Sequence, residues 1–379
     1  MLGRPSGEGG ARNWAHPDPK GAVDGASEPS HLVLNSSGKG SALHRYAVHL
    51  RSALGPRAVL VSLAMSTAQD LAHDEEQPLF GARTGWYTWD VVTNSLAPRI
   101  AFPGLRRMLE RAQRTGSTVH VASLDVPSIP IDTVSSVTIH DDPQAYFTTE
   151  LYGARTRYKA LQRLRLRHYR RAPIILATSE HVAAGLASFG IEQGVTVVYP
   201  PVDPVFRSLS ARAGLRSQLA LPEDTRLLLS VSSAEPRKNL GAVRRTMERL
   251  GSGFRLVRVG PPLEGSINFG RVPDEDLVRL FNACDALLFP SLEEGFGSPV
   301  AEALTVGLPV VASDIPIMRE VTAGAAILAD PSDERALARS VTEALERREE
   351  LAVKGTLRAR AFSFATFAEN IRSLWPDSN

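Results

Sequence analysis

The sequence predicts an α/β protein built from two doubly wound parallel sheets, for three reasons. Its 379 residues are the length of about two ordinary domains. Short apolar runs that suit buried strands alternate with segments of helical spacing, which is the pattern of parallel strands joined by helices. This alternation stops at residues 200–204, where three prolines stiffen a short crossing, and then begins again.

The same pattern sets the predicted domain boundaries. Residues 1–30 are rich in Gly, Pro, Ser and charged residues and have no aliphatic pattern, so we expect a disordered leader. Residues 31–200 should form the first domain and residues 201–360 the second. Residues 361–379 are predicted to form a C-terminal helix that follows the second domain.

In the first domain, short apolar runs predict six strands. Helical spacing of Leu43, Ala47 and Leu50 predicts a helix over residues 42–54, and Ser179 is a good N-cap for another helix. Residues 66–116 have no clean period. A helix is also predicted over 152–171, and the strands are predicted at 31–35, 58–63, 119–122, 136–139, 174–178 and 195–199.

In the second domain, five further apolar runs predict strands, with helices between them. The final helices should occupy residues 333–379. The strands are predicted at 227–230, 254–259, 286–289, 309–312 and 326–329.

Residues 290–302 read Pro-Ser-Leu-Glu-Glu-Gly-Phe-Gly-Ser-Pro-Val-Ala-Glu and are the most informative part of the chain. Gly295 and Gly297 leave a loop that is open to a ligand. Ser298 is predicted as the N-cap of a helix that ends at about Val306, where a glycine follows. A strand, a glycine turn and a helix N-terminus together offer backbone N–H groups to an anion.

Two carboxylates bracket this helix start. Glu294 lies in the loop, and Glu302 lies about one turn inside the helix. Because carboxylates repel phosphate, we interpret both side chains as acceptors for hydroxyl groups. A ligand with a central anionic group and hydroxyl groups on both sides of it is typical of a sugar nucleotide.

This segment resembles the nucleotide-sugar half of the retaining glycosyltransferases of the GT-B fold, specifically family 4. The family signature is two glutamates separated by seven residues, here Glu294 and Glu302, with Gly-Phe-Gly between them. The resemblance is strong over residues 226–345 and looser before. It implies two Rossmann-like doubly wound domains facing across a cleft, with the tail from residue 361 packed back on the first domain.

Residues 231–240 are similar to the diphosphate loop of the same family. Lys238 matches the lysine that neutralises the donor diphosphate, and Arg237 is an alternative cation whose side chain we expect to point elsewhere. The arginine or threonine of the family falls at Ser233 and its glycine at Ser232. This departure from the pattern removes a second cation from the phosphates.

The resemblance also implies site residues in the first domain. His140 follows a predicted strand, and ligands of open α/β sheets bind at the carboxyl ends of strands, so His140 is expected near the donor sugar. Asp141 and Asp142 either orient His140 or cap the next helix. Gly38 and Gly40 are expected where the backbone approaches the donor phosphate or the acceptor, because Val33 and Gly40 break the pattern of a P-loop.

The implied activity is transfer of a sugar from GDP-mannose or a UDP-sugar to an acceptor hydroxyl, with retained configuration, in cell-surface polysaccharide or glycolipid assembly. Lys238 would stabilise the departing nucleoside diphosphate, Glu302 would bind ribose hydroxyls and Glu294 would contact the sugar ring. The reaction would need no metal and no other cofactor. The backbone amides implied in diphosphate binding are those of Gly295, Phe296, Gly297 and Ser298.

Two other functions stay open. A nucleotide-binding protein of the same fold without transfer activity is favoured by the serine at position 233. An NAD-dependent oxidoreductase would need GxGxxG after the first strand of a domain, and neither residues 31–41 nor residues 227–239 contain it. Residues 274–276 are three consecutive acids that resemble a metal motif, but we interpret them as a helix start, where acids favour the helix dipole.

Composition narrows the partners and the compartment. A formal net charge of +2 is too small to indicate nucleic-acid binding. Cys284 is the single cysteine, so an internal disulfide is excluded, and its apolar neighbours predict a buried thiol. No apolar run is long enough to span a membrane, and the N-terminus has no apolar signal core, so we expect a cytoplasmic protein.

The segment 155–171 contains eight basic residues and no acidic one. One interpretation is a solvated helix that packs on the sheet through an apolar stripe of Tyr158, Leu161, Leu164 and Tyr169. The other is a basic surface that contacts anionic lipid headgroups while the enzyme acts on a sugar or lipid-linked acceptor at the inner face of the membrane. The basic residues are Arg155, Arg157, Lys159, Arg163, Arg165, Arg167, Arg170 and Arg171.

Overall fold

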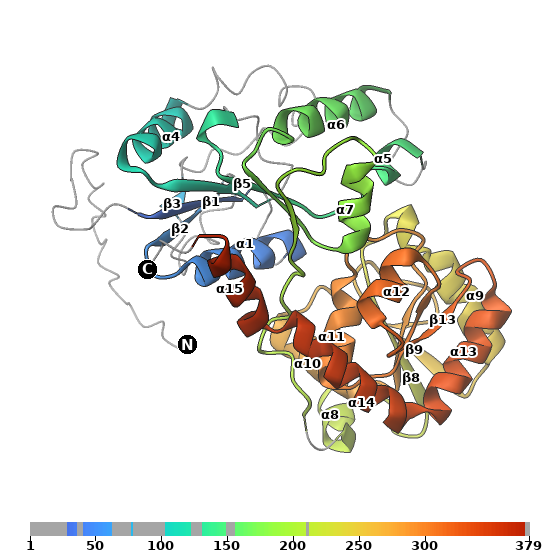
Figure 1. Ribbon diagram of the computed structural model, residues 1–379. Coiled ribbons are helices and arrows are strands. Elements are labelled where there is room, and N and C mark those ends of the chain that lie inside the picture. The colour runs from blue at the N-terminus through green and yellow to red at the C-terminus, as the bar shows by residue number, and fades with distance from the viewer. Residues whose placement is uncertain are drawn as a thin grey trace, which may run out of the picture.

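The computed structural model describes residues 29–35, 41–62, 77–78, 103–122, 131–148, 156–209 and 212–375, which form two α/β domains (Figure 1). The first domain has a seven-stranded sheet of order β3-β2-β1-β4-β5-β6-β7, and the second has a six-stranded sheet of order β10-β9-β8-β11-β12-β13. All the strand pairs in both sheets are parallel. The predicted fold class, two Rossmann-like domains, is therefore confirmed.

Side chains of the first sheet alternate between two apolar layers. Leu32 and Leu34 lie in the layer covered by α4, α6 and α7, whereas Val33 lies in the layer covered by α1 and the C-terminal helix α15. Both faces are thus buried, as expected of a parallel sheet. The elements are β1 His31–Asn35, α1 Ala42–Leu54, β2 Ala58–Ser62, β3 Gln77–Pro78, α4 Pro103–Thr115, β4 Thr118–Val121, a 3₁₀ turn at Ile131–Thr133, β5 Ser136–Ile139, α5 Ala145–Thr148, α6 Thr156–Tyr169, β6 Ile174–Ala177, α7 Glu180–Ala187 and β7 Val195–Val197.

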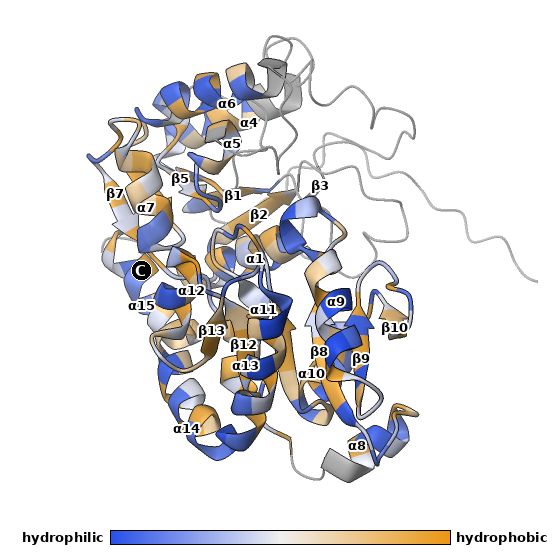
Figure 2. Ribbon diagram, turned by 90° about the vertical axis from the view of Figure 1, so that its right-hand side faces the viewer, coloured by the Kyte–Doolittle hydropathy of each residue, from blue (hydrophilic) through white to orange (hydrophobic). Residues whose placement is uncertain are grey.

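The second sheet repeats this arrangement, and its strands are largely hydrophobic while the outer sides of the flanking helices are polar (Figure 2). The five predicted strands are present, but β10 was not predicted because its residues are only partly buried and have no apolar run. The elements are α8 Arg212–Gln218, β8 Arg226–Val231, the 3₁₀ turn η3 Pro236–Lys238, α9 Leu240–Leu250, β9 Phe254–Val259, β10 Ile267–Gly270, α10 Asp274–Ala283, β11 Ala286–Phe289, α11 Ser298–Val306, β12 Val310–Ser313, α12 Pro316–Thr322, β13 Ile327–Ala329, α13 Glu334–Glu346, α14 Arg348–Ala359, a 3₁₀ turn at Arg360–Phe362 and α15 Phe364–Ser373.

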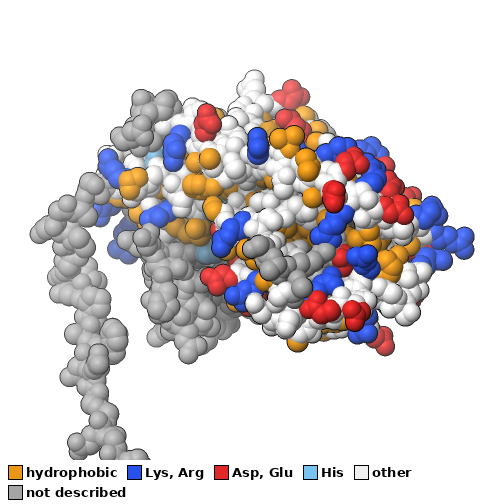
Figure 3. All heavy atoms as spheres, turned by 90° about the horizontal axis from the view of Figure 1, so that it is seen from below, with side chains coloured by type: hydrophobic (Ala, Val, Ile, Leu, Met, Phe, Trp, Pro, Cys, Tyr) orange, Lys and Arg blue, Asp and Glu red, His pale blue; other side chains and the backbone are white. Residues whose placement is uncertain are grey.

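Basic and acidic residues are nearly balanced in the sequence, and both kinds of side chain lie on the surface. Seen from below, basic and acidic side chains are interspersed (Figure 3). This fits the formal net charge of +2 and gives that face no large field of one sign.

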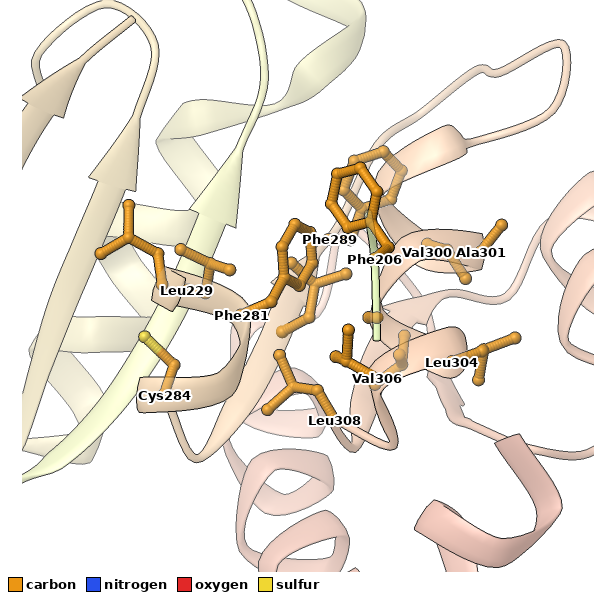
Figure 4. Close-up of a cluster of buried hydrophobic side chains, with 14 of the residues drawn as sticks. Phe206, Leu229, Phe281, Cys284, Phe289, Val300, Ala301, Leu304, Val306 and Leu308 are labelled. Atoms are coloured by element: carbon orange, nitrogen blue, oxygen red, sulfur yellow. The ribbon is translucent and has the colours of Figure 1, made fainter. Parts of the chain in front are cut away.

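A core of aromatic and aliphatic side chains lies between the second sheet and helices α10 and α11 (Figure 4). Phe281 of α10, Phe289 of β11, and Val300 and Leu304 of α11 all belong to this cluster. Cys284 is fully buried in the same cluster as a free thiol, which confirms the prediction made for it. This packing holds the start of α11 against the end of β11.

The chain crosses between the domains near Val202 and again near Phe362, and a hydrogen bond joins the two crossings. The amide of Val202 donates a hydrogen bond of 2.8 Å to the carbonyl of Phe362. Beyond the second crossing, α15 lies on α1, where Phe367 and Ile371 pack against Tyr46. The C-terminal helix therefore belongs to the core of the first domain (Figure 1).

Helix α6 carries the basic segment, but its packing differs from the predicted stripe. Leu164 is 53% exposed, whereas Arg165 is only 9% exposed and Leu166 is buried, so the predicted place of Leu164 against the sheet is wrong. The guanidinium of Arg163 lies 5.1 Å from the ring centre of Phe147. In the described part of the chain, no helix is long and apolar enough to cross a membrane.

Some predictions concern residues outside the described ranges. These are the leader up to residue 28, the glycine loop 36–40 with Gly38 and Gly40, and Arg155. The described side chains also leave out Arg157, Tyr158, Leu161 and Tyr169.

Two histidines, His31 of β1 and His120 of β4, are buried side by side in the first sheet. His31 Nδ1 lies 3.1 Å from His120 Nε2, and His120 Nδ1 lies 2.8 Å from Ser136 Oγ. The ring of Trp375 meets His120 edge-on at 4.5 Å, so the C-terminal segment closes this site. Burial lowers the pKa of His120 to about 3, and the neighbouring His31 lowers it further in the same direction.

We predict that acid destabilises the protein through this histidine. In the unfolded chain His120 takes up a proton as pH falls through about 6.5, but in the folded chain it does so only near about 3. Because the unfolded state then binds more protons, the free energy of unfolding falls with decreasing pH below 6.5, by at most about 1.4 kcal/mol per pH unit. Urea unfolding at pH 7.5 and pH 5.5 measures this loss.

The control is His120→Gln, which keeps a hydrogen-bonding side chain but does not titrate. Its stability should depend less on pH over this interval than that of the parent. Parallel pH profiles of the two proteins would contradict the prediction.

Candidate active site at the switch point of the second sheet

The second sheet changes direction between β8 and β11. The chain runs outward from β8 to β9 and β10 and then returns to β11 on the other side of β8. Such a switch point leaves a crevice outside the carboxyl ends of the two strands, where ligands of open α/β sheets bind. Here the crevice lies between residues 232–239 and 290–297, which are joined by a hydrogen bond of 2.7 Å from the Leu292 amide to the Arg237 carbonyl.

The start of α11 is one residue earlier than predicted. Gly297 is the N-cap, with φ 87° and ψ 55°, and Ser298 is the first helical residue, so the prediction of Ser298 as N-cap is wrong. The left-handed conformation of Gly297 and the close methyl group of Met318 exclude a side chain there. The predicted end at Val306 is confirmed.

The turn before α11 presents free backbone donors. Within the described residues, the amides of Gly295, Phe296 and Gly297 have no backbone acceptor. They lie just ahead of the positive end of α11. Together they can bind an anion such as a phosphate.

Glu294 is held between two cations. Its carboxylate is 5% exposed and lies 2.6 Å from Lys238 Nζ and 3.1 Å from Arg237 Nη1. The expectation that Arg237 points elsewhere is wrong, because the loop after β11 runs beside the turn η3 that contains both cations. The pair of cations compensates the cost of burying this carboxylate.

Glu302 is buried inside α11 and meets an arginine from the other domain. Its carboxylate, 4% exposed, lies 3.1 Å from Nη2 of Arg45 on α1, and Nη1 of Arg45 lies 2.6 Å from Asp274. Burial raises the pKa of Glu302 to about 7, although Arg45 acts in the opposite direction. Arg45 was not predicted as a site residue, because it is one of several arginines on predicted helices and is 257 residues away from Glu302.

The acidic run at residues 274–276 forms the first turn of α10, which confirms its interpretation as a helix start. Asp274 pairs with Arg45, and Asp276 pairs with Arg279 at 3.2 Å. Asp274 and Asp276 thus have separate partners.

A pocket opens between the domains beside Glu302, so the two domains face one another across a cleft as predicted. It is formed by α1, the crossing segment and the start of α11. Its lining includes Arg45, Tyr46, His49, Asp203, Phe296 and Glu302.

His140 follows β5 and lies against the loop of the second domain. Its Nε2 donates a hydrogen bond of 2.6 Å to the Ala122 carbonyl, and its ring meets Tyr46 edge-on at 4.7 Å. A Cβ on Gly295 would overlap the His140 carbonyl oxygen, so only glycine allows this approach. The hydroxyl of Ser179 donates to the Gly295 carbonyl at 2.9 Å. The structure thus brings His140 beside the Glu294 loop.

The two aspartates after His140 have local partners. Asp141 accepts a hydrogen bond of 2.9 Å from the hydroxyl of Tyr146, and Asp142 accepts one of 2.9 Å from the Gln144 amide. The second contact is an Asx turn that leads into α5.

A further group, which sequence analysis missed, bridges the domains at this point. His181 Nε2 lies 3.8 Å from Asp142 and 3.7 Å from Glu293. In the part of the chain that the structure describes, these three are the one group whose ligand atoms lie close enough to hold a metal ion. The neighbouring Glu293 and Asp142 raise the pKa of His181 and so favour its charged form, although burial acts in the opposite direction.

Comparison with known proteins agrees with this geometry. Residues 212–360 match the family model described as "Glycosyl transferases group 1". An "O-antigen chain mannosyltransferase B" of Escherichia coli is 34% identical over 160 residues, which are 36% of this chain and 42% of that protein. A "Serotype-specific mannosyltransferase WbdA" of Escherichia coli is 26% identical over 251 residues, 58% of this chain and 30% of that protein. The chain therefore spans less than half the length of these relatives.

Two solved structures share the fold over both domains. The Anabaena protein Alr3699/HepE, in complex with UDP and glucose, has a TM-score of 0.72 at 16% identity over 92% of this chain and 100% of that chain. WaaG, described as a glycosyltransferase involved in lipopolysaccharide biosynthesis, has a TM-score of 0.67 at 16% identity over 91% and 99% of the two chains. The fold is thus that of GT-B glycosyltransferases, and residues 212–360 match the glycosyl transferases group 1 family in sequence.

Proposed function

We propose that this protein is a retaining glycosyltransferase of family 4, which moves a sugar from a nucleotide-sugar donor to an acceptor hydroxyl. One observation carries the proposal. At the switch point of the second sheet, free backbone amides, two cations and a buried carboxylate converge on one crevice. This set suits a diphosphate attached to a sugar better than a phosphate or a carbohydrate alone.

The chemistry of the proposed reaction is stabilisation of a leaving group. When the bond between the sugar and the diphosphate breaks, negative charge grows on the diphosphate, and donors aimed at it lower the barrier. Lys238 and the amides of residues 295–298 would supply these donors. Lys238 is paired with Glu294, so donor binding would draw Lys238 into sharing its charge between Glu294 and the diphosphate.

The other site residues would hold the donor. Glu302 would accept hydrogen bonds from ribose hydroxyls and Glu294 from the sugar ring, while His140 would lie near the transferred sugar. Gly38 and Gly40 would allow the first domain to approach the donor phosphate or the acceptor. We propose that the reaction needs no metal and no other cofactor.

The donor and the acceptor are proposed by similarity. The mannosyltransferases to which the chain is similar favour GDP-mannose, and the fold neighbour whose complex contains UDP favours a UDP-sugar. The names of the O-antigen mannosyltransferases also favour polysaccharide or glycolipid assembly. We propose a cytoplasmic protein whose acceptor is a sugar chain or a lipid-linked sugar.

A second candidate is a sugar-nucleotide-binding protein of the same fold that does not catalyse transfer. Ser233, in place of a cation, favours it. Turnover of a bound donor in the presence of acceptor distinguishes the two.

We predict that one class of sugar nucleotide stabilises the protein in a thermal-shift panel of UDP-, GDP- and ADP-sugars. For that donor, Glu302→Ala should weaken binding measured by calorimetry by about 1.5–3 kcal/mol, the value of hydrogen bonds to a charged acceptor. Asp274→Ala is the matched control, since it removes the other carboxylate that Arg45 contacts. Unchanged affinity of Glu302→Ala would remove the ribose role, and no stabilisation by any donor would overturn the proposed function.

Lys238→Ala should slow sugar transfer by about 100-fold or more, because the growing charge of the diphosphate loses a donor. Steady-state turnover measures the effect, and EDTA should leave the parent rate largely intact. The control is Arg237→Ala, which removes the other cation from Glu294. A loss below about fivefold for Lys238→Ala with a larger one for Arg237→Ala would assign the role to Arg237.

We predict that the exposed arginines of the α6 region attract anionic membranes by ~1 kcal/mol each. Arg165 is excluded from this set because it is buried. A variant with Arg163, Arg167, Arg170 and Arg171 changed to Gln should co-sediment less with vesicles that contain anionic lipid. Binding of the parent should fall with salt, since the Debye length is only ~10 Å at 0.1 M.

The matched control changes four exposed arginines of the second domain, Arg244, Arg245, Arg249 and Arg255, to Gln. It has the same net charge as the α6 variant and should sediment like the parent. Equal sedimentation of all three proteins would argue for a soluble acceptor and a merely solvated α6.

A further inference from the structure

Arg258 of β9 is a fully buried cation that faces backbone oxygens instead of carboxylates. Within the described residues, no carboxylate lies within ion-pair distance of it, and all but one of its hydrogen bonds go to backbone carbonyls. Burial lowers the pKa of Arg258 to about 10, which leaves it protonated at neutral pH. The carbonyls belong to Ser230 at 3.2 Å, Ser232 at 2.5 Å, Ser233 at 3.4 Å, Val259 at 2.9 Å and Pro261 at 3.2 Å.

These bonds fix the orientation of two peptide units in the loop after β8. The carbonyls of Ser232 and Ser233 point to the guanidinium. In a planar trans peptide the following N–H points the opposite way, so the amides of Ser233 and Ala234 face away from Arg258. In the described part of the chain neither amide has a backbone acceptor.

The order of the strands shows where these amides point. β9 and β11 flank β8 on opposite sides. The Ser232 amide donates to the Val259 carbonyl of β9, and the Ser232 carbonyl lies against Gly260 and Arg258 on the same side. The Ser233 amide points the opposite way, toward β11 and the crevice with Lys238 and Glu294. Arg258 thus orients the Ser233 amide toward the crevice and places a positive charge behind the loop.

The contact leaves no room for a side chain beside it. Gly260 has φ +121°, and a Cβ there would overlap the Ser232 carbonyl oxygen and lie 3.0 Å from Arg258 Nη2. The bond between Arg258 and the loop thus depends on glycine at position 260.

We propose that Arg258 is a positioning residue for the donor diphosphate, which supplies from behind the loop the positive potential that Ser233 does not supply from within it. The inference rests on the proposed function and deepens it. A buried cation without a carboxylate partner is costly. An anion bound to the amides of the loop would offset part of that cost, so the site is built to favour a ligand of high negative charge.

The test compares ligands that differ only in phosphate number: uridine, UMP and UDP, and guanosine, GMP and GDP. Arg258→Gln should lower the affinity for the diphosphate by roughly ten- to hundredfold, the range for hydrogen bonds to a charged group, and leave that for the nucleoside unchanged. Arg258→Lys keeps the charge and should lose less. Calorimetry or competition binding gives the affinities, and equal losses for all three ligands, or no loss, would overturn the inference.

A second pair of variants covers the case in which Arg258→Gln does not fold. Gly260→Ala should push the loop off Arg258 and lower the affinity for the diphosphate selectively. Gly265→Ala is the matched control, because Gly265 has φ +77° but open space around its Cβ position. Equal diphosphate affinity of the two variants would overturn the inference.

The outcomes also separate this inference from the proposed function. If the parent protein binds no nucleoside diphosphate, the proposed function fails, and this inference fails with it. If the parent binds one and the variants show no dependence on phosphate number, only the role of Arg258 fails.

Discussion

The buried carboxylate of Glu294, held between Lys238 and Arg237, is the interaction on which the rest of the site depends. A carboxylate that is 5% exposed is costly unless cations and hydrogen bonds satisfy it. Satisfying it ties the turn η3, which follows β8, to the loop that follows β11. The start of α11 and its free amides are placed as a consequence, because they continue the same loop.

The first domain completes this arrangement through a few close contacts. The carbonyl of His140 reaches Gly295, Ser179 donates to the Gly295 carbonyl, and Arg45 reaches Glu302. On the far side, Glu320 of α12 accepts hydrogen bonds of 2.7 and 2.9 Å from the amides of Glu180 and His181 at the start of α7. The crevice of the second sheet is thus covered by the carboxyl ends of the first, and a donor bound there would meet groups from both domains.

The cations of the site lie at different distances from the crevice. Lys238 and Arg237 lie at the crevice with a carboxylate between them, whereas Arg258 lies behind the loop and is bound to carbonyls. A cation behind the loop turns peptide dipoles toward the crevice, so its effect is exerted through the backbone. This arrangement lets a serine stand at position 233 and still leaves the loop attractive to an anion.

Features that depend on neighbouring residues could be predicted from the sequence. Apart from β3 and β10, the strands of both domains follow from local apolar runs, and so does the segment from β11 to the end of α11 with its glycines. Glu294, Glu302 and Lys238 could be singled out for the same reason, because their spacing within the two loops is local.

Which distant side chains meet depends on how the chain packs in three dimensions. Arg45 and Glu302 are 257 residues apart, and no local pattern distinguishes Arg45 from the other arginines of the chain. Arg258 is a polar residue within a predicted strand, and nothing in that strand shows that its side chain binds the loop after β8. The buried face of α6, which turned Arg165 inward and Leu164 outward, was set by the elements that pack against it. Local propensity fixes where elements begin and end, but charge pairing and burial depend on contacts that form only when the sheets and domains come together.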